Sequence, residues 1–521
     1  MSRRPLPIGI NNFPEIRKKG FAYVDKTAQI YSLLTSSSKA FYLSRPPRFG
    51  KSLLCSTIQA VLEGRRELFG EIAGSPALAI NSLDWDWQEQ PVIVLDLCTG
   101  VQPNSAESIH SALSSMIKRE ATRHGIVSND DDNCMNTLTG LLTEICEKTG
   151  RKAAIIVDGC DALLLGNRTD NPAIQGELTG VFSLIKSYDA YLNFVFFTGE
   201  TVNAPASVFP DSDQLVDISF DSRFATICGF TETEATTTFA EEIVVILTET
   251  NREYQEYLEN LHHHYLGYQF TERLQKMCNP FSLLNHFSNH GEFFPYWHET
   301  NDSYLTSLLR IGITTLNALP IPHEDLRNSH SKEMETLRVL YSSGYLTITD
   351  YADGSYTLGF PNLEATTALA TALLKRCLRV PYDRVNALFN RLPVTLTDGD
   401  IDGTLNVMRQ YLAAIPQDSI KEIENYYATM VFIIFSILHI DFRCELWLDS
   451  GRMDVLVEST KFIHCLKFAL DETAEEAMSQ INTSQYHVLR RWENSKKLIK
   501  TGVSFDGNTY NIRDWKYTVS S

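Results

Sequence analysis

A short segment, residues 45–52, has the residue types and spacing of a loop that binds phosphate. It reads RPPRFGKS, and its last three residues, Gly50, Lys51 and Ser52, match the end of the pattern G-x-x-x-x-G-K-[ST]. In such a loop, backbone N–H groups hold phosphate oxygens, the lysine reaches the β- and γ-phosphates, and the serine hydroxyl binds Mg²⁺. The segment therefore predicts binding of ATP with Mg²⁺; a surface turn in front of a helix is the alternative.

The flanking sequence supplies the elements that such a loop requires. Residues 40–43 are apolar and predict a strand, while residues 53–62 show apolar side chains at helical spacing. A strand, a loop and then a helix are the context in which a phosphate-binding loop works, because the N-terminus of the helix also attracts anions. The departure lies at the first position of the pattern, where Arg45 replaces glycine.

Two later strand ends carry polar residues that suit the same nucleotide. The apolar run 153–157 is followed by Asp158, which predicts the carboxylate that orients Mg²⁺. The run 194–197 is followed by Thr198, whose hydroxyl is suited to sensing the γ-phosphate. A turn at the end of a strand explains Thr198 equally well, so this residue is the weaker of the two candidates.

The acid that would activate water is missing beside Asp158. In a nucleotide hydrolase of this type, an acid directly after the metal-binding carboxylate polarises the attacking water, and here that position is Gly159. Because glycine has no side chain to accept a proton, ATP hydrolysis is predicted to be weak or absent. Asp161 is the candidate replacement as a catalytic base, although nothing in the sequence fixes its orientation.

Hydrophobic patterning divides the chain into three regions. In the first, continuous apolar strands alternate with helical stretches, which predicts an α/β fold with a parallel sheet. From about residue 230 to 375 the pattern is mainly helical, with a hairpin within 341–360. The last region begins with helices and then predicts strands and one further helix; these lie at 444–448, 453–458, 461–468 and 473–483.

Composition excludes several classes of protein. The chain has 521 residues, of which 43% are hydrophobic and 21% charged, so it is neither disordered throughout nor a collagen-like or coiled-coil rod. Its net charge of −18 argues against nonspecific nucleic-acid binding by the whole surface, but a local basic segment lies at residues 490–500. The ten cysteines include no CxxC pair, so reduced thiols are expected.

No membrane association is expected. The most apolar run, residues 430–440, is far shorter than the roughly 20 residues that span a bilayer. The N-terminus has charges but no apolar stretch of a secretory signal behind them. A cytoplasmic protein is therefore predicted.

The chain resembles the bacterial AAA-ATPase-like proteins that carry a C-terminal PD-(D/E)XK nuclease-like domain. The similarity extends over nearly the whole length, and together its motifs are highly specific. The matching segments are residues 6–9, 23–27, 45–52, 198–199, 217–219, 228–231, 267–270, 279–282, 296–297, 344–347, 361–364, 451–454, 480–481 and 502–505.

The resemblance implies a fold class and a set of domains. It implies an AAA-like P-loop parallel sheet with a helical extension over 1–285, a helical or winged-helix-like connector over 286–375, and an α/β PD-(D/E)XK-like domain over 376–521. The family's loop also has arginine in the first-glycine position, so Arg45 fits. Predicted nucleotide-binding residues are Arg45, Arg48, Gly50, Lys51, Ser52, Asp158 and Thr198, with Ser52 and Asp158 also as metal ligands.

The resemblance also implies a second site, of the nuclease type. In such nucleases one Asp and a second acid hold Mg²⁺ while a Lys on the neighbouring strand positions water. Asp454 fits the first role and Lys467 the last, but the family's Glu-x-Lys begins here with Cys465, a poor ligand for Mg²⁺. Strand alternation places residues 465 and 467 on one face. Other candidate acids are Glu424, on the helix before these strands, and Glu475 or Glu476.

Two functions follow from these residues. The first is a protein that binds ATP, hydrolyses it weakly or not at all, and carries a degenerate nuclease-like domain; it would act as a regulatory or nucleic-acid-associated protein. The alternative is an active ATPase coupled to a Mg²⁺-dependent DNA nuclease in mobile-element or defence biology. Missing acids at two separate positions, Gly159 and Cys465, favour the first. DNA or RNA bound by the C-terminal domain and a homo-oligomer are the partners considered.

Overall fold

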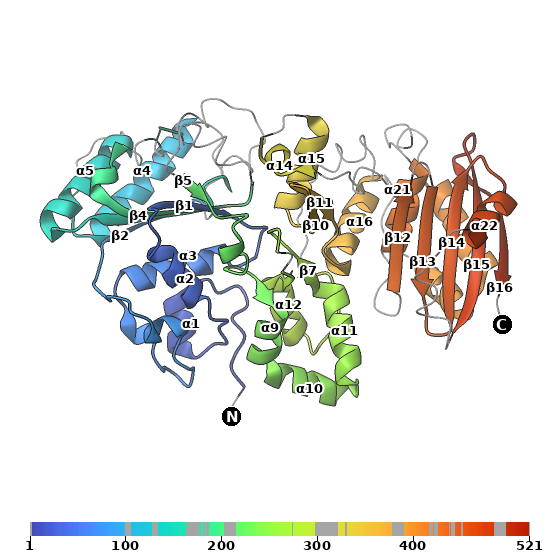
Figure 1. Ribbon diagram of the computed structural model, residues 1–521, viewed down its shortest axis with the longest axis horizontal. Coiled ribbons are helices and arrows are strands. Elements are labelled where there is room, and N and C mark those ends of the chain that lie inside the picture. The colour runs from blue at the N-terminus through green and yellow to red at the C-terminus, as the bar shows by residue number, and fades with distance from the viewer. Residues whose placement is uncertain are drawn as a thin grey trace. The chain divides into compact units, whose positions relative to one another are not determined.

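The computed structural model is shown in Figure 1. The chain divides into an N-terminal unit, Met1–Glu292 with Pro320–Thr357, and a C-terminal unit, Phe293–Leu319 with Leu358–Ser521. The structure describes residues 3–98, 106–127, 134–162, 176, 179–180, 183, 187–202, 215–273, 275–296, 321–328, 331–377, 390–415, 420, 426–436, 438, 443–449, 452–483 and 496–519.

The N-terminal unit is built on a five-stranded parallel sheet with the strand order β2-β3-β4-β1-β5. Because β4 is inserted between β1 and β3, the loop after β1 and the ends of β3 and β4 meet at one edge of the sheet. This edge is where ligands bind in open parallel sheets. The strands are β1 (Ala40–Ser44), β2 (Val92–Asp96), β3 (Ala153–Asp158), β4 (Leu192–Gly199) and β5 (Leu215–Asp217).

Helices cover both faces of this sheet, which explains why its strands are continuous apolar runs rather than alternating ones. Helices α4 and α5 lie on one face, and α1, α2 and α3 lie on the other (Figure 1). Every residue of β3 is buried. The helices are α1 (Phe13–Lys19), α2 (Thr27–Leu34), α3 (Lys51–Leu62), α4 (Ala106–Arg123) and α5 (Cys134–Thr149), with single 3₁₀ turns at η1 (Arg66–Leu68), η2 (Ala79–Ser82), η3 (Asp189–Tyr191) and η4 (Ser222–Phe224).

The rest of the N-terminal unit is a helical extension followed by a small antiparallel hairpin region. The extension contains β6 (Phe230–Thr231), α9 (Glu232–Thr238), α10 (Ala240–Thr250), α11 (Tyr254–Tyr265), β7 (Leu266–Tyr268), β8 (Met277–Cys278) and α12 (Pro280–Ser288). The hairpin region, which has the two helices and paired strands of a winged helix, contains β9 (Ile321–Pro322), α14 (His323–Asn328), α15 (Lys332–Ser342), β10 (Thr347–Ala352) and β11 (Ser355–Gly359).

The C-terminal unit contains a mixed sheet in the order β12-β13-β14-β15-β16, in which only the β14–β15 pairing is parallel. At Gly502 of β15 a Cβ atom would overlap the backbone of α22, so glycine permits the helix to pack directly on the strand. The elements are α16 (Leu363–Cys377), α18 (Arg391–Asp398), α19 (Ile401–Ala413), α21 (Tyr426–Ser436), β12 (Arg443–Asp449), β13 (Arg452–Glu458), β14 (Phe462–Leu470), α22 (Ala474–Thr483), β15 (Lys497–Asp506) and β16 (Asn511–Val519).

The predicted fold class is therefore confirmed: an α/β P-loop sheet, a helical and winged-helix-like middle, and a C-terminal α/β domain. The predicted strands and helices recur with ends shifted by a few residues. The domain boundaries at 285/286 and 375/376 stay predictions. Within the described part of the chain, no helix is both long and apolar enough to cross a membrane.

Candidate functional site

Arg45, the residue in place of the first glycine, supports the phosphate loop from behind. Its guanidinium donates hydrogen bonds to the carbonyl oxygens of Ser44, Ser219 and Phe224 at 2.8, 2.9 and 3.1 Å. The same group lies 4.3 Å from the centre of the Phe270 ring, a cation–π contact. Arg45 is buried, so in this structure it fixes the start of the loop to the sheet and the helical extension rather than facing the cavity.

The loop itself curls around the amine of Lys51. Lys51 Nζ donates to the carbonyl oxygens of Arg45 at 2.8 Å and Pro46 at 3.0 Å. Two residues have the left-handed backbone that this tight path requires, Arg48 at φ 63° and Gly50 at φ 93°. Lys51 is 7% exposed and opens the helix α3, so its charge and the helix N-terminus act at the same place.

A cavity of about 320 Å³ lies against this loop. Its polar end contains Gly50, Lys51 and Ser52 together with Arg48, whose guanidinium packs 4.1 Å from the Phe281 ring. Its apolar end is formed by the N-terminal segment and the helical extension; the residues there include Pro7, Ile10, Val24, Ile227, Phe230, Phe239, Pro280 and Leu284. A cavity of this volume, apolar with a few convergent polar groups, is typical of small-molecule sites.

Asp158 and Thr198 lie beside each other at the edge of the sheet. The Thr198 hydroxyl donates to Asp158 Oδ1 at 2.6 Å and accepts from the Gly159 amide at 3.1 Å. Both side chains are buried, so the threonine holds the carboxylate in one orientation. The structure thus brings together two residues predicted from separate strands.

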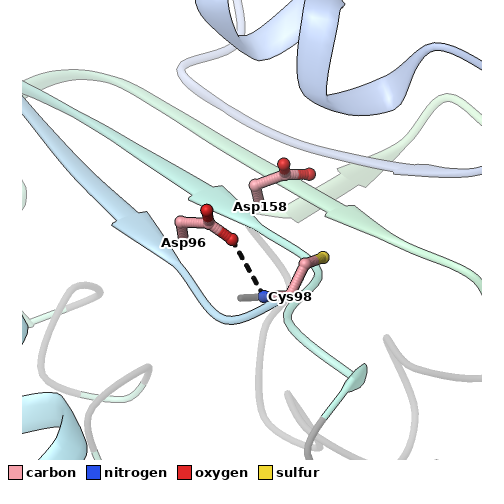
Figure 2. Close-up of side chains that lie close together, drawn as sticks. All are labelled: Asp96, Cys98 and Asp158. Atoms are coloured by element: carbon pink, nitrogen blue, oxygen red, sulfur yellow. Dashed lines mark hydrogen bonds between the residues drawn. The ribbon is translucent and has the colours of Figure 1, made fainter. Parts of the chain in front are cut away.

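Asp96 and Cys98 join Asp158, and sequence reasoning missed both. One ligand atom from each of the three side chains lies within 4.8 Å of the others (Figure 2). The Asp96 carboxylate also accepts a hydrogen bond from the Cys98 amide at 2.9 Å (Figure 2). The signal that could have found Asp96 was its place at the end of β2, on the same edge of the sheet as Asp158.

These residues fit a bound Mg²⁺. Carboxylate and hydroxyl oxygens are the hard donors that Mg²⁺ prefers, and Asp158, Asp96 and Ser52 supply them. Burial and the charges of Asp158 and Asp96 raise the pKa of the Cys98 thiol to about 12. Cysteine sulfur is a soft ligand that suits Mg²⁺ poorly, so the oxygen donors are the expected ligands. A metal held there would neutralise charge on the phosphates of the nucleotide.

Position 159, where an acid is predicted, has no room for a Cβ atom unless Cys98 moves. Gly159 has φ 71°, and a Cβ atom on it would overlap Cys98 Sγ. An L-residue with a side chain is strained in this conformation even where space is open. A side chain at residue 159 would therefore need a different backbone conformation and a movement of Cys98, which lies just after β2.

The carboxylate of Asp161, the predicted replacement base, accepts hydrogen bonds from the turn after β4. Its carboxylate is 1% exposed and accepts hydrogen bonds from the Glu200 amide at 3.0 and 3.1 Å and from the Thr201 amide and hydroxyl, each at 2.6 Å. In this structure Asp161 fixes the turn after β4. The turn carries Glu200, which lines the cavity and which sequence reasoning also missed.

In the C-terminal unit the structure places Asp454 and Lys467 directly opposite each other. Asp454 of β13 pairs with Lys467 of β14, and Cys465 pairs with Leu456 two residues along. Residues opposite each other in an antiparallel pair share a face, so the predicted grouping of 454, 465 and 467 holds at the level of register. Cys465 is buried in an apolar cluster with Leu456, Ile463, Met478 and Ile481.

The other candidate acids of this unit have different roles or cannot be described. Glu475 forms an ion pair with Lys516 of β16, and Glu476 accepts hydrogen bonds from the Thr473 amide and hydroxyl at the start of α22. In the basic segment, Lys496 pairs with Glu458 at 2.6 Å. Glu424, Arg490 and Arg491 lie outside the described residues.

Comparison with known proteins identifies the family. The family model described as "Predicted AAA-ATPase" matches residues 7–209, and the one described as "PD-(D/E)XK nuclease superfamily" matches residues 422–515. A protein of Azotobacter chroococcum mcd 1, described as "Uncharacterized protein in vnfD 5'region", is 30% identical over 507 residues, which cover 93% of each chain. The chain therefore belongs to the AAA-ATPase-like family with a C-terminal domain of the PD-(D/E)XK nuclease superfamily.

Solved structures show only distant similarity. The Aeropyrum pernix ORC2 protein in ADPNP–ADP complexes gives a TM-score of 0.31 at 12% identity and covers 69% of this chain and 94% of its own. The Aeropyrum pernix ORC1 protein in complex with DNA gives 0.26 at 10% identity and covers 68% and 94%. Scores this low transfer no property of those proteins to this chain.

Proposed function

We propose that this chain is an ATP-binding protein that hydrolyses ATP slowly and carries a degenerate nuclease-like domain, acting as a nucleotide-dependent regulatory or nucleic-acid-associated protein. The observation that supports it most is the cavity at the phosphate loop, which joins Lys51 and Ser52 to an apolar end. Lys51 would meet the β- and γ-phosphates, and the apolar end would take the base and ribose. The closeness of Asp158 to Asp96, and the Ser52 hydroxyl in the cavity lining, support Mg²⁺ as the accompanying ion.

Calorimetry with ATP and Mg²⁺ on the full chain tests the binding step. Lys51→Ala removes the charge that meets the phosphates, and we expect at least tenfold weaker binding, or about 1.4 kcal/mol. Lys18→Ala is the matched control, because Lys18 is an exposed lysine on α1 away from the cavity lining. Wild-type protein that binds no ATP would refute the proposal.

The proposal for the C-terminal domain is that it does not cut DNA efficiently. Its support is the burial of Cys465 among apolar side chains at the position of the second acid. A metal with one of its two hard ligands missing is held mostly by water and polarises a phosphodiester poorly. Cleavage of single- and double-stranded DNA is measured with Mg²⁺ and with Mn²⁺. Cleavage by the wild type that Asp454→Ala abolishes would favour the alternative, an active nuclease.

A further inference from the structure

We propose that Glu200 supplies the carboxylate that polarises the attacking water in ATP hydrolysis, in place of the acid missing at Gly159. Glu200 comes directly after β4, the strand inserted between the phosphate-loop strand β1 and the Asp158 strand β3. A side chain at this point lies between the two halves of the phosphate site. The inference rests on the ATP site proposed above.

Glu200 is close to Lys51 and partly exposed in the cavity, as a side chain that contacts a water molecule beside bound phosphate must be. Its carboxylate oxygen Oε1 lies 3.9 Å from Lys51 Nζ, and the side chain lines the cavity with 32% of its surface exposed. A γ-phosphate oxygen bound to Lys51 would lie about 2.8 Å from Nζ. A water molecule next to that phosphate is therefore within hydrogen-bond reach of Glu200.

The backbone of Glu200 is fixed by a buried carboxylate. Asp161 accepts hydrogen bonds from the amides of Glu200 and Thr201 and from the Thr201 hydroxyl. The Thr201 carbonyl in turn accepts a hydrogen bond from the buried Tyr42 hydroxyl at 2.5 Å. A catalytic side chain needs such support, since a shift of about 1 Å costs up to about 10²-fold in rate. Asp161 is thus a positioning residue for Glu200.

Glu200 and Cys98 both line the cavity, and Cys98 Sγ occupies the space that a Cβ atom of residue 159 would need. An acid reaching the water from β4 instead of β3 fills the same role by a different route.

The chemical step balances with ATP and water alone. The water oxygen forms a bond to the γ-phosphorus, and the bond from that phosphorus to the β–γ bridging oxygen breaks, its electron pair leaving on ADP. The water proton passes to the Glu200 carboxylate and from there to phosphate or solvent. Lys51 holds the charge on the transferred phosphoryl group while this happens.

The test combines ATP binding with single-turnover phosphate release by an excess of the full chain. We expect Glu200→Gln to lower the hydrolysis rate at least 100-fold, the usual size of a general-base contribution. ATP affinity should stay within threefold or rise, because a negative charge 3.9 Å from Lys51 competes with phosphate. Glu241→Gln, an exposed glutamate of α10, is the matched control and should change neither quantity.

Each result separates this inference from the proposed ATP site. ATP bound by both proteins with hydrolysis lost only in Glu200→Gln supports the role of Glu200. Equal hydrolysis in both, or wild-type protein that binds ATP with no measurable turnover, overturns that role while the ATP site stands. Tighter ATP binding with unchanged turnover would show that Glu200 acts only as a counter-ion of Lys51. Wild-type protein that binds no ATP overturns both proposals.

Discussion

The resemblance predicts an acid at Gly159 in the N-terminal unit and at Cys465 in the C-terminal unit, and these two positions have opposite surroundings. Gly159 lies against Cys98, which lines the cavity together with Glu200, and Asp96 and Asp158 lie close to Cys98 at the ends of neighbouring strands. Cys465 is enclosed by apolar side chains beneath α22. A carboxylate that lines a cavity beside a cation can take over from another, and Glu200 is such a neighbour in the N-terminal unit. The residues packed around Cys465 in its cluster are apolar instead. We therefore expect the N-terminal site to keep weak activity and the C-terminal site to have none.

Returning the acid to the C-terminal unit is the strongest test of this contrast. Cys465→Glu would place a carboxylate in an apolar cluster, where burial raises the pKa of an acid by several units. We expect a loss of about 3 kcal/mol or more in the stability of this unit and no gain of DNA cleavage. Denaturant unfolding and a cleavage assay measure the two effects, with Cys465→Ala as the control that creates only a small cavity. Stable, cleaving Cys465→Glu protein would contradict the contrast.

Lowering the pH should reduce the stability of the C-terminal unit, because His464 of β14 is buried. This ring is buried and its Nε2 donates to the Leu396 carbonyl at 2.8 Å, while within the described structure Nδ1 has no hydrogen-bond partner. Burial lowers the pKa of His464 to about 4, below its unfolded value near 6.5. The unfolded chain then binds more protons below pH 6.5, so the stabilisation is complete above that pH and is lost as the pH falls toward 4.

The expected loss is about 2 kcal/mol at pH 5. Hydrogen exchange of β14 amides at pH 7 and pH 5 measures it, corrected for intrinsic exchange rates. His464→Gln keeps a donor for Leu396 and should remove most of this pH dependence. His286 of α12 in the N-terminal unit also has its pKa lowered to about 4 by burial. The N-terminal unit of the His464→Gln variant should therefore still lose stability between pH 7 and pH 5. An unchanged response of β14 in His464→Gln would argue against His464.

Restoring the acid in the N-terminal unit should fail for a geometric reason. Gly159→Glu forces an L-residue to φ 71° and against Cys98 Sγ, at a cost of about 1–2 kcal/mol from the backbone alone. We expect lower thermal stability and no faster ATP hydrolysis. Cys98→Ala combined with Gly159→Glu relieves the overlap and should recover part of the stability. Faster hydrolysis by the single variant would show that the position is open after all.

The sequence predicted those features that depend on local pattern. The strands of the parallel sheet, the loop ending in Gly50, Lys51 and Ser52, and Asp158 at a strand end all follow from residues close together in the chain. The roles of Arg45 and Glu200 could not be predicted, because they depend on partners far away in the sequence. Arg45 is held by carbonyls about 180 residues later, and Glu200 reaches Lys51 only because β4 lies beside β1.

The smallest predicted effect concerns nucleic-acid binding by the basic segment of the C-terminal unit. Lys497 is exposed, whereas Lys496 Nζ is bound to Glu458 Oε1 at 2.6 Å and to the Ser459 carbonyl at 2.7 Å. A lysine already paired with a carboxylate releases few counterions when a phosphate approaches. Lys496 is therefore the matched control for Lys497.

If double-stranded DNA binds here, Lys497→Ala should reduce the slope of log K against log salt by about 0.9, and Lys496→Ala by much less. Fluorescence anisotropy across a salt series measures both slopes. Equal slopes for both variants and the wild type would place the DNA-binding surface away from this segment, and the C-terminal unit would then have neither a complete metal site nor the basic surface proposed for it.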